Sequence, residues 1–495
     1  MTMKFKSTRD TAVNPTLVSA AYAIKTGLAP DGGLYIPESV PTLNWADFDA
    51  LIAMTYEERA AKILSLYLTD YTYDELYADA CAAYAPEKFG EYAAPLHQMS
   101  DGVYSLELWH GPTCAFKDMA LQIMPRLLSR ALTKTGETRT AHILVATSGD
   151  TGKAALEGYK DVDGVKISVF YPVDGVSMMQ KRQMQTTGGN NTYVAAIRGN
   201  FDNAQTGVKE IFGSAELADK ANESGFFFSS ANSINWGRLV PQIVYYVSAY
   251  CDLVKNGDIA LGDKINVCVP TGNFGNIFAA YLAYEMGLPV NRFICASNQN
   301  DVLTQFMETG VYDRRREFHK TISPSMDILI SSNLERLLSV LGGAEVTRDL
   351  MEALKTDGIY QAPAKLTEKV QALFSGYSLN DDETKAEIAS VYEKDGYLID
   401  PHTAVATGAV KKYRARTGDM TKTVTASTAS PYKFAPAVAE ALGMTEPDDI
   451  FDLLDQLAEK TGTTVPAPLA ETRSLPIRFN DVYDPAEMPD AVFKA

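Results

Sequence analysis

The sequence predicts an α/β fold with mostly parallel sheets covered by helices, divided into two or three lobes. Short apolar runs typical of buried strands alternate with segments of helical periodicity, which favours parallel strands with helices on both faces. The strand-like runs lie at residues 142–147, 165–171, 191–197, 265–270, 291–297 and 422–426, and the helical segments at 153–159, 177–185, 202–212, 277–286 and 302–309. The length of 495 residues exceeds what one compact core usually holds, so more than one lobe is expected.

Composition and charge exclude several classes of partner. The chain has 45 basic and 62 acidic residues, a formal net charge of −17, which argues against nucleic acid or an anionic membrane as a partner. An anionic substrate must therefore be held by local donors. The five cysteines and five histidines are scattered without metal-binding or CxxC spacing, so neither a metal site nor a disulfide framework is expected. The N-terminus lacks an apolar signal segment and no apolar run reaches membrane-spanning length, which predicts a cytoplasmic protein.

Three parts are expected along the chain. They are a small N-terminal domain, a core with a mainly helical insertion, and a proline-rich tail that wraps the surface. Their ranges are residues 1–94, residues 95–465 with the insertion at about 345–395, and residues 466–495. The first part contains an amphipathic helix at 16–25, a turn-rich segment at 27–37 and a tyrosine-rich helical region at 45–85.

Lys117 is the most informative single residue. It follows the turn formers at 111–113 and precedes a helical pattern whose apolar positions share one face, so it is expected near a helix N-terminus. Burial and the partial positive charge of a helix start both disfavour the charged form of a lysine. A neutral amine is a nucleophile that forms a Schiff base with a carbonyl group. The alternative is an ordinary surface lysine at a helix start.

Two strand–loop–helix units carry glycine-bracketed loops. The first loop reads Ser148-Gly-Asp-Thr-Gly152 and the second Thr271-Gly-Asn-Phe-Gly-Asn276. A loop of this kind at a helix start presents free backbone N–H groups to an anion. The second loop is also expected at the edge of a parallel sheet where ligands bind. The first loop is not a nucleotide P-loop, because Thr147 and Ala154 stand at two positions that the motif requires to be different. A plain tight turn is the alternative for each loop.

Three further stretches are polar. A cluster at residues 230–238 precedes a long apolar helix at 239–253, and its side chains either cap that helix or contribute to a site. The segment Ser323-Pro-Ser-Met-Asp-Ile328 has no role that its chemistry reveals. His402 follows an Asp-Pro helix start and is the histidine expected nearest the site, but a capping or core role is the favoured interpretation.

The run His110-Gly-Pro-Thr-Cys-Ala-Phe-Lys117-Asp118 resembles the cofactor-lysine motif of threonine synthases, which hold pyridoxal phosphate (PLP) on that lysine. These enzymes belong to the PLP-dependent group related to the tryptophan synthase β-subunit. The resemblance continues in order along essentially the whole chain. Its other stretches are Ser7-Thr-Arg9, Ala29-Pro-Asp-Gly-Gly-Leu-Tyr-Ile-Pro37, the two glycine loops, Asn232-Ser-Ile-Asn-Trp236, the 323–328 segment and Ser427-Thr-Ala-Ser-Pro-Tyr-Lys-Phe434.

The resemblance implies two lobes with PLP in the cleft between them and assigns roles to particular residues. Lys117 would hold the cofactor, and Thr428 would hydrogen-bond its pyridine nitrogen. The loop expected to bind the cofactor phosphate comprises Gly272, Asn273, Phe274, Gly275 and Asn276. The expected substrate contacts are Ser148, Asp150, Thr151, Asn232, Ser233, Asn235 and Arg238. Ser430 and Tyr432 depart from the family, which commonly has His and Ala there.

The reaction that the resemblance implies converts O-phospho-L-homoserine and water to L-threonine and phosphate, the last step of threonine biosynthesis. Lys117 would be displaced from PLP by the substrate amine and would then move protons between substrate carbons. The expected assembly is a monomer or a homodimer. Two alternatives stay open: a PLP-dependent phospholyase acting on O-phosphothreonine or O-phosphoserine, and a catalytically silent sensor of an amino-acid phosphate.

Overall fold

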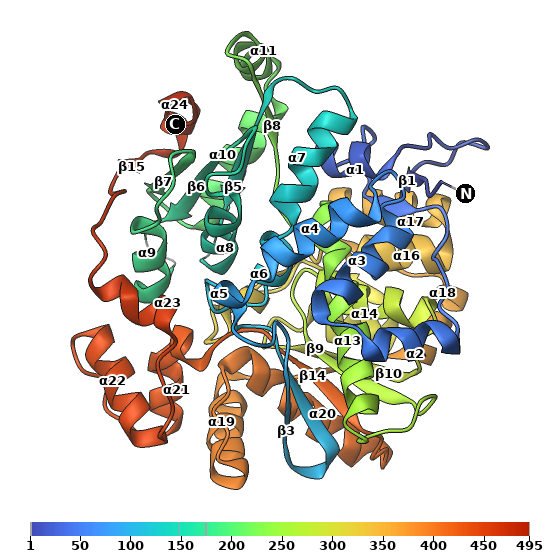
Figure 1. Cartoon of the computed structure of the whole chain (residues 1–495), viewed down its shortest axis with the longest axis vertical. Helices are drawn as coiled ribbons and strands as arrows, with labels where there is room; N and C mark the ends of the chain where they lie inside the picture. Colours follow the sequence, from blue (N-terminus) through green and yellow to red (C-terminus); the bar gives the residue numbers. More distant parts are fainter. Residues whose placement is uncertain (1, 148, 174–175, 495) are drawn as a thin grey trace.

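The computed structural model describes the chain except residues 1, 148, 174–175 and 495. Two large sheets, each covered by helices, form the centres of two lobes, which confirms the predicted α/β fold (Figure 1). In the described part of the chain, no helix is long and apolar enough to cross a membrane.

The five-stranded sheet is entirely parallel and has the strand order β15-β7-β6-β5-β8. Its strands are β5 (Thr140–Ala146), β6 (Val165–Pro172), β7 (Thr192–Ile197), β8 (Phe226–Ser229) and β15 (Val482–Tyr483). The helices of this lobe are α8 (Asp150–Tyr159), α9 (Met178–Gln185), α10 (Phe201–Gly213), α11 (Ala215–Glu223) and α24 (Met488–Lys494). Successive strand residues alternate between faces: Leu144 packs toward α10 and α24, whereas Val145 belongs to the main core.

The C-terminal segment does more than wrap the surface. Strand β15 pairs in parallel with β7, and the buried residues Met488 and Val492 of α24 pack on the five-stranded sheet. Figure 1 shows the C-terminus beside this sheet. The expectation of a surface tail missed this because a two-residue strand carries too little periodicity to be recognised.

The six-stranded sheet has the order β13-β10-β9-β14-β4-β3 and is parallel except for the edge strand β3. Its strands are β3 (Leu96–Gln98), β4 (Val103–Glu107), β9 (Ile265–Pro270), β10 (Val290–Ser297), β13 (Phe374–Ser378) and β14 (Thr423–Ser427). Around it are α13 (Pro241–Lys255), α14 (Gly275–Glu285), α15 (Val302–Thr309), α20 (Pro401–Thr417), α21 (Ala435–Ala441), α22 (Ile450–Thr461) and α23 (Ala467–Ala470). One face of β9 and β10 packs with residues of α20 and the other with residues of α14, so both faces are buried.

The region expected to be a helical insertion also completes this sheet. It contains the helices α17 (Ala344–Thr356), α18 (Ala364–Leu373) and α19 (Asp381–Asp395), preceded by α16 (Leu334–Gly342). It also contains β12 (Ile359–Gln361), which pairs with β11 (Val311–Asp313), and β13, which pairs in parallel with β10. The expectation of a mainly helical elaboration was incomplete, because β13 is a five-residue edge strand with little apolar sequence.

The N-terminal region packs into the same core as the rest of the chain. It consists of β1 (Phe5–Ser7), α1 (Ala20–Thr26), β2 (Tyr35–Pro37), α2 (Trp45–Ala53), α3 (Tyr56–Tyr67), α4 (Tyr73–Ala83) and α5 (Pro86–Phe89). Phe5 and Tyr67 both contact the ring of Trp236, at centroid distances of 5.1 and 5.6 Å. Arg9 forms a bidentate ion pair with Glu335 of α16, at 2.8 and 2.7 Å. The N-terminal region is therefore held against the lobe that contains the six-stranded sheet.

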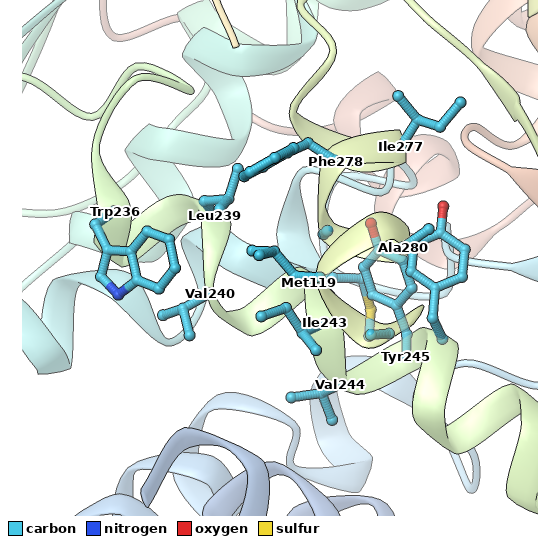
Figure 2. Close-up of a cluster of buried hydrophobic side chains, with 14 of the residues drawn as sticks. Met119, Trp236, Leu239, Val240, Ile243, Val244, Tyr245, Ile277, Phe278 and Ala280 are labelled. Carbon is cyan, nitrogen blue, oxygen red and sulfur yellow. The ribbon is translucent and has the colours of Figure 1, made fainter. Parts of the chain in front are cut away.

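A continuous apolar cluster fixes the helix that begins after Lys117. Helix α6 (Asp118–Leu121) and helix α7 (Met124–Lys134) follow the lysine, and α12 (Trp236–Leu239) leads into α13. Figure 2 shows Met119 of α6 among side chains of α12, α13 and α14, including Leu239, Ile243 and Phe278. These side chains are fully buried. Close packing of this kind leaves the start of α6 little freedom to move.

Candidate active site

The lysine turn and the end of the last core strand lie against each other. The N–H of Phe116 donates to the carbonyl oxygen of Thr428 at 2.8 Å, and Ala115 forms an isolated bridge with Ala429. Lys117 stands at the N-cap position of α6, as the sequence predicts. The structure thus brings the predicted residues Lys117 and Thr428 together at the carboxyl edge of the six-stranded sheet, where parallel sheets bind ligands.

The turn before Lys117 is held by the carboxylate of Asp118. Its two oxygens accept hydrogen bonds from the N–H and the hydroxyl of Thr113, both at 2.8 Å. Burial raises the pKa of Asp118 to about 6, although the Thr113 bonds act in the opposite direction. The carbonyl of Thr113 in turn accepts a hydrogen bond from Lys433 at 2.8 Å. Both ends of the turn are therefore anchored by buried polar groups.

The amine of Lys117 is mostly buried and surrounded by polar groups. Its side chain is 10% exposed, and its Nζ lies 3.4 Å from the Oγ of Ser325 and 3.7 Å from an oxygen of Asp150. Burial lowers the pKa of Lys117 to about 8, and the positive charges of Arg238 and Lys433 add to this effect while Asp150 opposes it. A neutral, nucleophilic amine is therefore accessible close to neutral pH, as expected of a Schiff-base lysine.

Asp150 divides its two oxygens between two sets of partners. The Oδ1 atom accepts from Lys433 at 2.8 Å and from Gln180 at 3.0 Å. The Oδ2 atom faces Lys117 and accepts from the hydroxyl of Ser325 at 3.4 Å. Burial by itself would raise the pKa of Asp150, but Lys433 and Lys117 hold it well below its usual range. Asp150 therefore acts as the ion-pair partner of the two lysines. It is not expected to bind the substrate, because an ionised carboxylate would repel an anionic substrate group.

The first glycine loop uses part of its donor capacity internally. The hydroxyl of Thr147 accepts from the N–H groups of Gly149 and Gly152, at 2.9 and 3.0 Å. Gly149, at φ 139°, precedes the first residue of α8. The hydroxyl of Thr151 lies 3.5 Å from the guanidinium of Arg238 and remains available to a ligand. Ser148, also predicted as a substrate contact, lies outside the described residues.

The second glycine loop lies directly beside the lysine. A Cβ built on Gly272 would lie 2.7 Å from the carbonyl oxygen of Ser325, the residue whose hydroxyl contacts Lys117. Phe274 adopts φ 63° at the N-cap of α14, and the first helical bond runs from Phe278 N–H to its carbonyl. The N–H groups of the first turn of α14 therefore point out of the helix end, as an anion site requires. The carbonyl of Asn273 is held by Asn333.

Asn276 supplies the clearest sign that a ligand belongs at this loop. Its side-chain oxygen accepts from Tyr245 at 2.8 Å and also from Tyr246. Its amide nitrogen is buried and has no acceptor among the described residues. A buried donor without a partner is costly, and a phosphate at the start of α14 would satisfy it. The residues present thus fit the phosphate of PLP.

In the 232–238 cluster, Asn235 has a structural role. Asn235 caps α12 by accepting from Gly237 N–H at 2.9 Å, and it donates to the carbonyl of Ile24 at 2.9 Å. The capping interpretation therefore accounts for Asn235, whereas Asn232 and Ser233 remain half-buried.

Arg238 is buried without a carboxylate partner in the described part of the chain. Its guanidinium donates to the carbonyl of Ala231 at 2.9 Å and makes the long contact to Thr151. Burial lowers the pKa of Arg238 to about 10. A buried cation with so few partners is the group best placed to receive an anion.

Two residues of the site, Ser325 and Lys433, were not identified from the sequence. Ser325, in the 323–328 segment, contacts both Lys117 and Asp150, and its N–H donates to Nε2 of His402 at 3.1 Å. The other ring nitrogen of His402 lies 2.7 Å from Asp400, so the histidine holds Ser325 in place. Lys433 is fully buried beside Asp150. The Tyr-Lys-Phe end of the 427–434 motif was the available signal for Lys433.

A cavity of about 500 Å³ adjoins this cluster. Gln180 and Lys433, the two partners of Asp150 Oδ1, line it together with Pro324 and Phe434. The cavity therefore borders the candidate site next to the two partners of Asp150.

Protein-family models cover most of the chain. The model described as pyridoxal-phosphate dependent enzyme matches residues 91–429, and models of the threonine synthase N terminus and C-terminal region match residues 4–84 and 403–487. Threonine synthase of Pseudomonas aeruginosa is 38% identical over 481 residues, which cover 95% of this chain and 97% of that protein. Human threonine synthase-like 1 is 41% identical over 436 residues, 86% of this chain, and the match spans only 58% of that protein's length.

Solved structures give the same result. The crystal structure of threonine synthase from yeast matches with a TM-score of 0.89 at 32% identity, covering 99% of this chain and 98% of the other. PLP-bound threonine synthase from Brucella melitensis matches with a TM-score of 0.87 at 36% identity, covering 99% of each chain. Together with the lysine turn, the glycine loop and the buried arginine, these matches show that the chain belongs to the threonine synthase family of pyridoxal-phosphate-dependent enzymes.

Proposed function

We propose that the protein converts O-phospho-L-homoserine and water to L-threonine and phosphate, with PLP held on Lys117. The observation that carries the proposal is the combination, in one site, of a buried lysine amine beside Asp150 and Ser325 and a buried arginine that has no carboxylate partner among the described residues. The first suits an amine that must lose its proton to react, and the second suits a substrate with an anionic group. The relatives named threonine synthase, at 38% and 34% identity, support the same reaction.

The residues that would hold the cofactor come from three elements. Lys117 would bind it covalently, the loop from Gly272 to Asn276 would bind its phosphate, and Thr428 would face its ring nitrogen. When bound, the cofactor supplies an electron sink that stabilises negative charge on the carbon skeleton of an amino acid. The orphaned amide nitrogen of Asn276 supports the assignment of the phosphate to this loop.

Arg238 and Thr151 would hold an anionic group of the substrate. A guanidinium and a hydroxyl together offer several donors to phosphate or carboxylate oxygens, and burial strengthens these hydrogen bonds. The local charge matters because the whole chain, at −17, repels an anionic substrate.

Lys117 would move protons at the substrate carbons once its amine is free. One flexible amine near the reacting carbons can remove a proton at one atom and return it at the next. Ser325 and Asp150, at 3.4 and 3.7 Å from Nζ, would accept hydrogen bonds from the free amine and keep it beside the substrate. A pKa of about 8 leaves roughly a tenth of the amine neutral at pH 7 in the absence of other changes.

Product analysis tests the proposal. Purified, PLP-saturated protein is incubated with O-phospho-L-homoserine, and phosphate and amino-acid products are followed together. Equimolar phosphate and threonine are expected. A 2-oxo acid with ammonia, formed from O-phosphothreonine or O-phosphoserine, would identify a phospholyase instead. Absence of both turnover and the Schiff-base absorbance would identify a silent sensor. A variant of the exposed Lys264, K264A, serves as a control that should retain full activity.

A further inference from the structure

One buried carboxylate is shared by two buried lysines. Asp150 contacts Lys433 at 2.8 Å and Lys117 at 3.7 Å, and the Lys433 side chain has no exposed surface. The contact to Lys433 is the shorter, and it uses the oxygen of Asp150 that does not face Lys117. The proposed reaction uses only one of the two lysines.

We propose that Lys433 is a positioning residue that acts on Lys117 through Asp150. It serves as the permanent counter-charge of Asp150 and so leaves the Lys117 amine free to lose its proton. The inference rests on the proposed function only in taking Lys117 as the cofactor lysine.

The geometry shows why Lys433 is the fixed partner. Its Nζ is held between Asp150 Oδ1 and the carbonyl of Thr113, both at 2.8 Å. Gln180 donates to the same oxygen of Asp150 at 3.0 Å. Thr113 belongs to the turn that carries Lys117, so Lys433 ties the lysine turn to the start of α8. Since the Lys433 side chain is fully buried, its charge must be matched by a buried partner, and Asp150 is the carboxylate in contact with it.

The ion pair between Lys433 and Asp150 sets the free-energy cost of removing a proton from Lys117. If Lys117 were the sole partner of Asp150, a neutral Lys117 amine would leave a buried carboxylate without a counter-charge. That penalty would hold the amine in its charged form. Because Lys433 keeps Asp150 paired, Lys117 can become neutral, and Oδ2 of Asp150 and the hydroxyl of Ser325 still orient the amine.

Among the described residues, Asp150 is the only ionised carboxylate that faces the amine of Lys117. Asp118, its neighbour in sequence, is turned away and bonded to Thr113. Arg238 adds a second positive charge that favours the neutral amine, and the ring of Phe116 lies 4.8 Å from Nζ. Cys114, near Asp150, has its pKa raised by burial to about 12 and stays neutral.

The test measures the Lys117 amine directly in the full chain. Trace labelling with acetic anhydride over a range of pH, followed by peptide mass spectrometry, gives the pKa of each lysine without requiring turnover. The assay is run on protein freed of cofactor, and the attachment of added PLP is followed in parallel by absorbance. Failure of the proposed reaction would leave these two readouts interpretable, since neither depends on the substrate.

Opposite shifts are expected for the two partners. K433M should raise the pKa of Lys117 by about one unit and lower its labelling at pH 7 about tenfold, because Asp150 then turns to Lys117. D150N should lower the pKa of Lys117, because the carboxylate 3.7 Å from its amine is lost. The double variant D150N/K433M should lie close to D150N, because Lys433 then has no shared carboxylate through which to act on Lys117. The matched control is K153M: Lys153 is also buried on α8 but bonds Glu157 and Thr187 instead.

Comparing the K433M shift in the native and D150N proteins separates two mechanisms. Lys433 either acts through Asp150 or repels the charged Lys117 amine directly. K433M should shift Lys117 less than half as much in the D150N background as in the native one. An equal shift in both backgrounds, or no shift in either, overturns the proposal. If K433M does not fold by circular dichroism, K433Q replaces it in both backgrounds, and the same comparison decides.

Discussion

The N–H of Phe116 donates a hydrogen bond of 2.8 Å to the carbonyl of Thr428, and this bond joins the lysine turn to the end of the last core strand. It places the residue that would carry the cofactor beside the residue that would face the cofactor ring. The two segments lie far apart in sequence, and each is short and irregular. Their contact depends on β4 and β14 being neighbours in the six-stranded sheet.

Attachment of PLP should depend steeply on pH. The reactive form of Lys117 is neutral, and its pKa is lowered by burial to about 8, so the neutral fraction grows as pH rises through 8. In cofactor-free protein, the rate of Schiff-base formation should increase about tenfold between pH 6 and 7 and level off above pH 8. Stopped-flow absorbance measures this rate. K117A should form no Schiff base at any pH, and a midpoint near 10.5 would show that Lys117 is not desolvated.

Two of the buried arginines, Arg238 and Arg336, should respond in opposite ways to removal. R238M should lower turnover at least a hundredfold, chiefly through KM, because an anion-binding cation is lost. The same change should leave thermal stability equal or higher, since it removes a poorly paired buried charge. Kinetic assays and thermal unfolding measure the two effects.

Arg336 is the matched control for that experiment. It is equally buried, but it donates to the carbonyls of Tyr35 and Ile234 and to the side chain of Asn333. R336M should destabilise the protein by about 3 kcal/mol, because three buried acceptors lose their donor. Equal stability losses in R238M and R336M would contradict the distinction between a free and a satisfied arginine.

Asn235 should prove structural. N235A removes the cap of α12 and the bond to Ile24, and a loss of about 1–2 kcal/mol of unfolding free energy is expected. KM for the substrate should change less than threefold. Denaturant unfolding and steady-state kinetics provide both numbers, and a large rise in KM without loss of stability would restore Asn235 as a substrate contact.

Gly272 should be intolerant of a side chain. The Cβ of G272A would lie 2.7 Å from the carbonyl of Ser325, closer than van der Waals contact allows. The loop and Ser325 must then separate, and PLP affinity should fall at least tenfold. Fluorescence titration with PLP measures the affinity. G213A is the control, because Gly213 of α10 has open space around it and a helical position that favours alanine.

Sequence patterning predicted the elements bounded by turn residues well and the strands at sheet edges poorly. Strand β9 and helix α15 begin and end where the periodicity predicts, because each is bounded by clear turn residues. Strand β8 and strand β13 were missed, since a few residues at a sheet edge carry little alternation. Helix α8 begins at Asp150, three residues before the predicted start, because the loop glycine itself serves as the N-cap.

The sequence by itself determined the fold class, the family resemblance, Lys117 and the two glycine loops, since each of these is written in local patterns of neighbouring residues. Only the tertiary structure decided which charges share the site. It paired Asp150 with Lys433, used Asn235 as a cap and brought Ser325 to the lysine. Among the residues that the structure describes, it left Arg238 with no carboxylate partner. The physical reason is that the role of a charged group depends on which opposite charges lie within a few ångströms and on how much water reaches them. Both depend on the packing of segments distant in the chain.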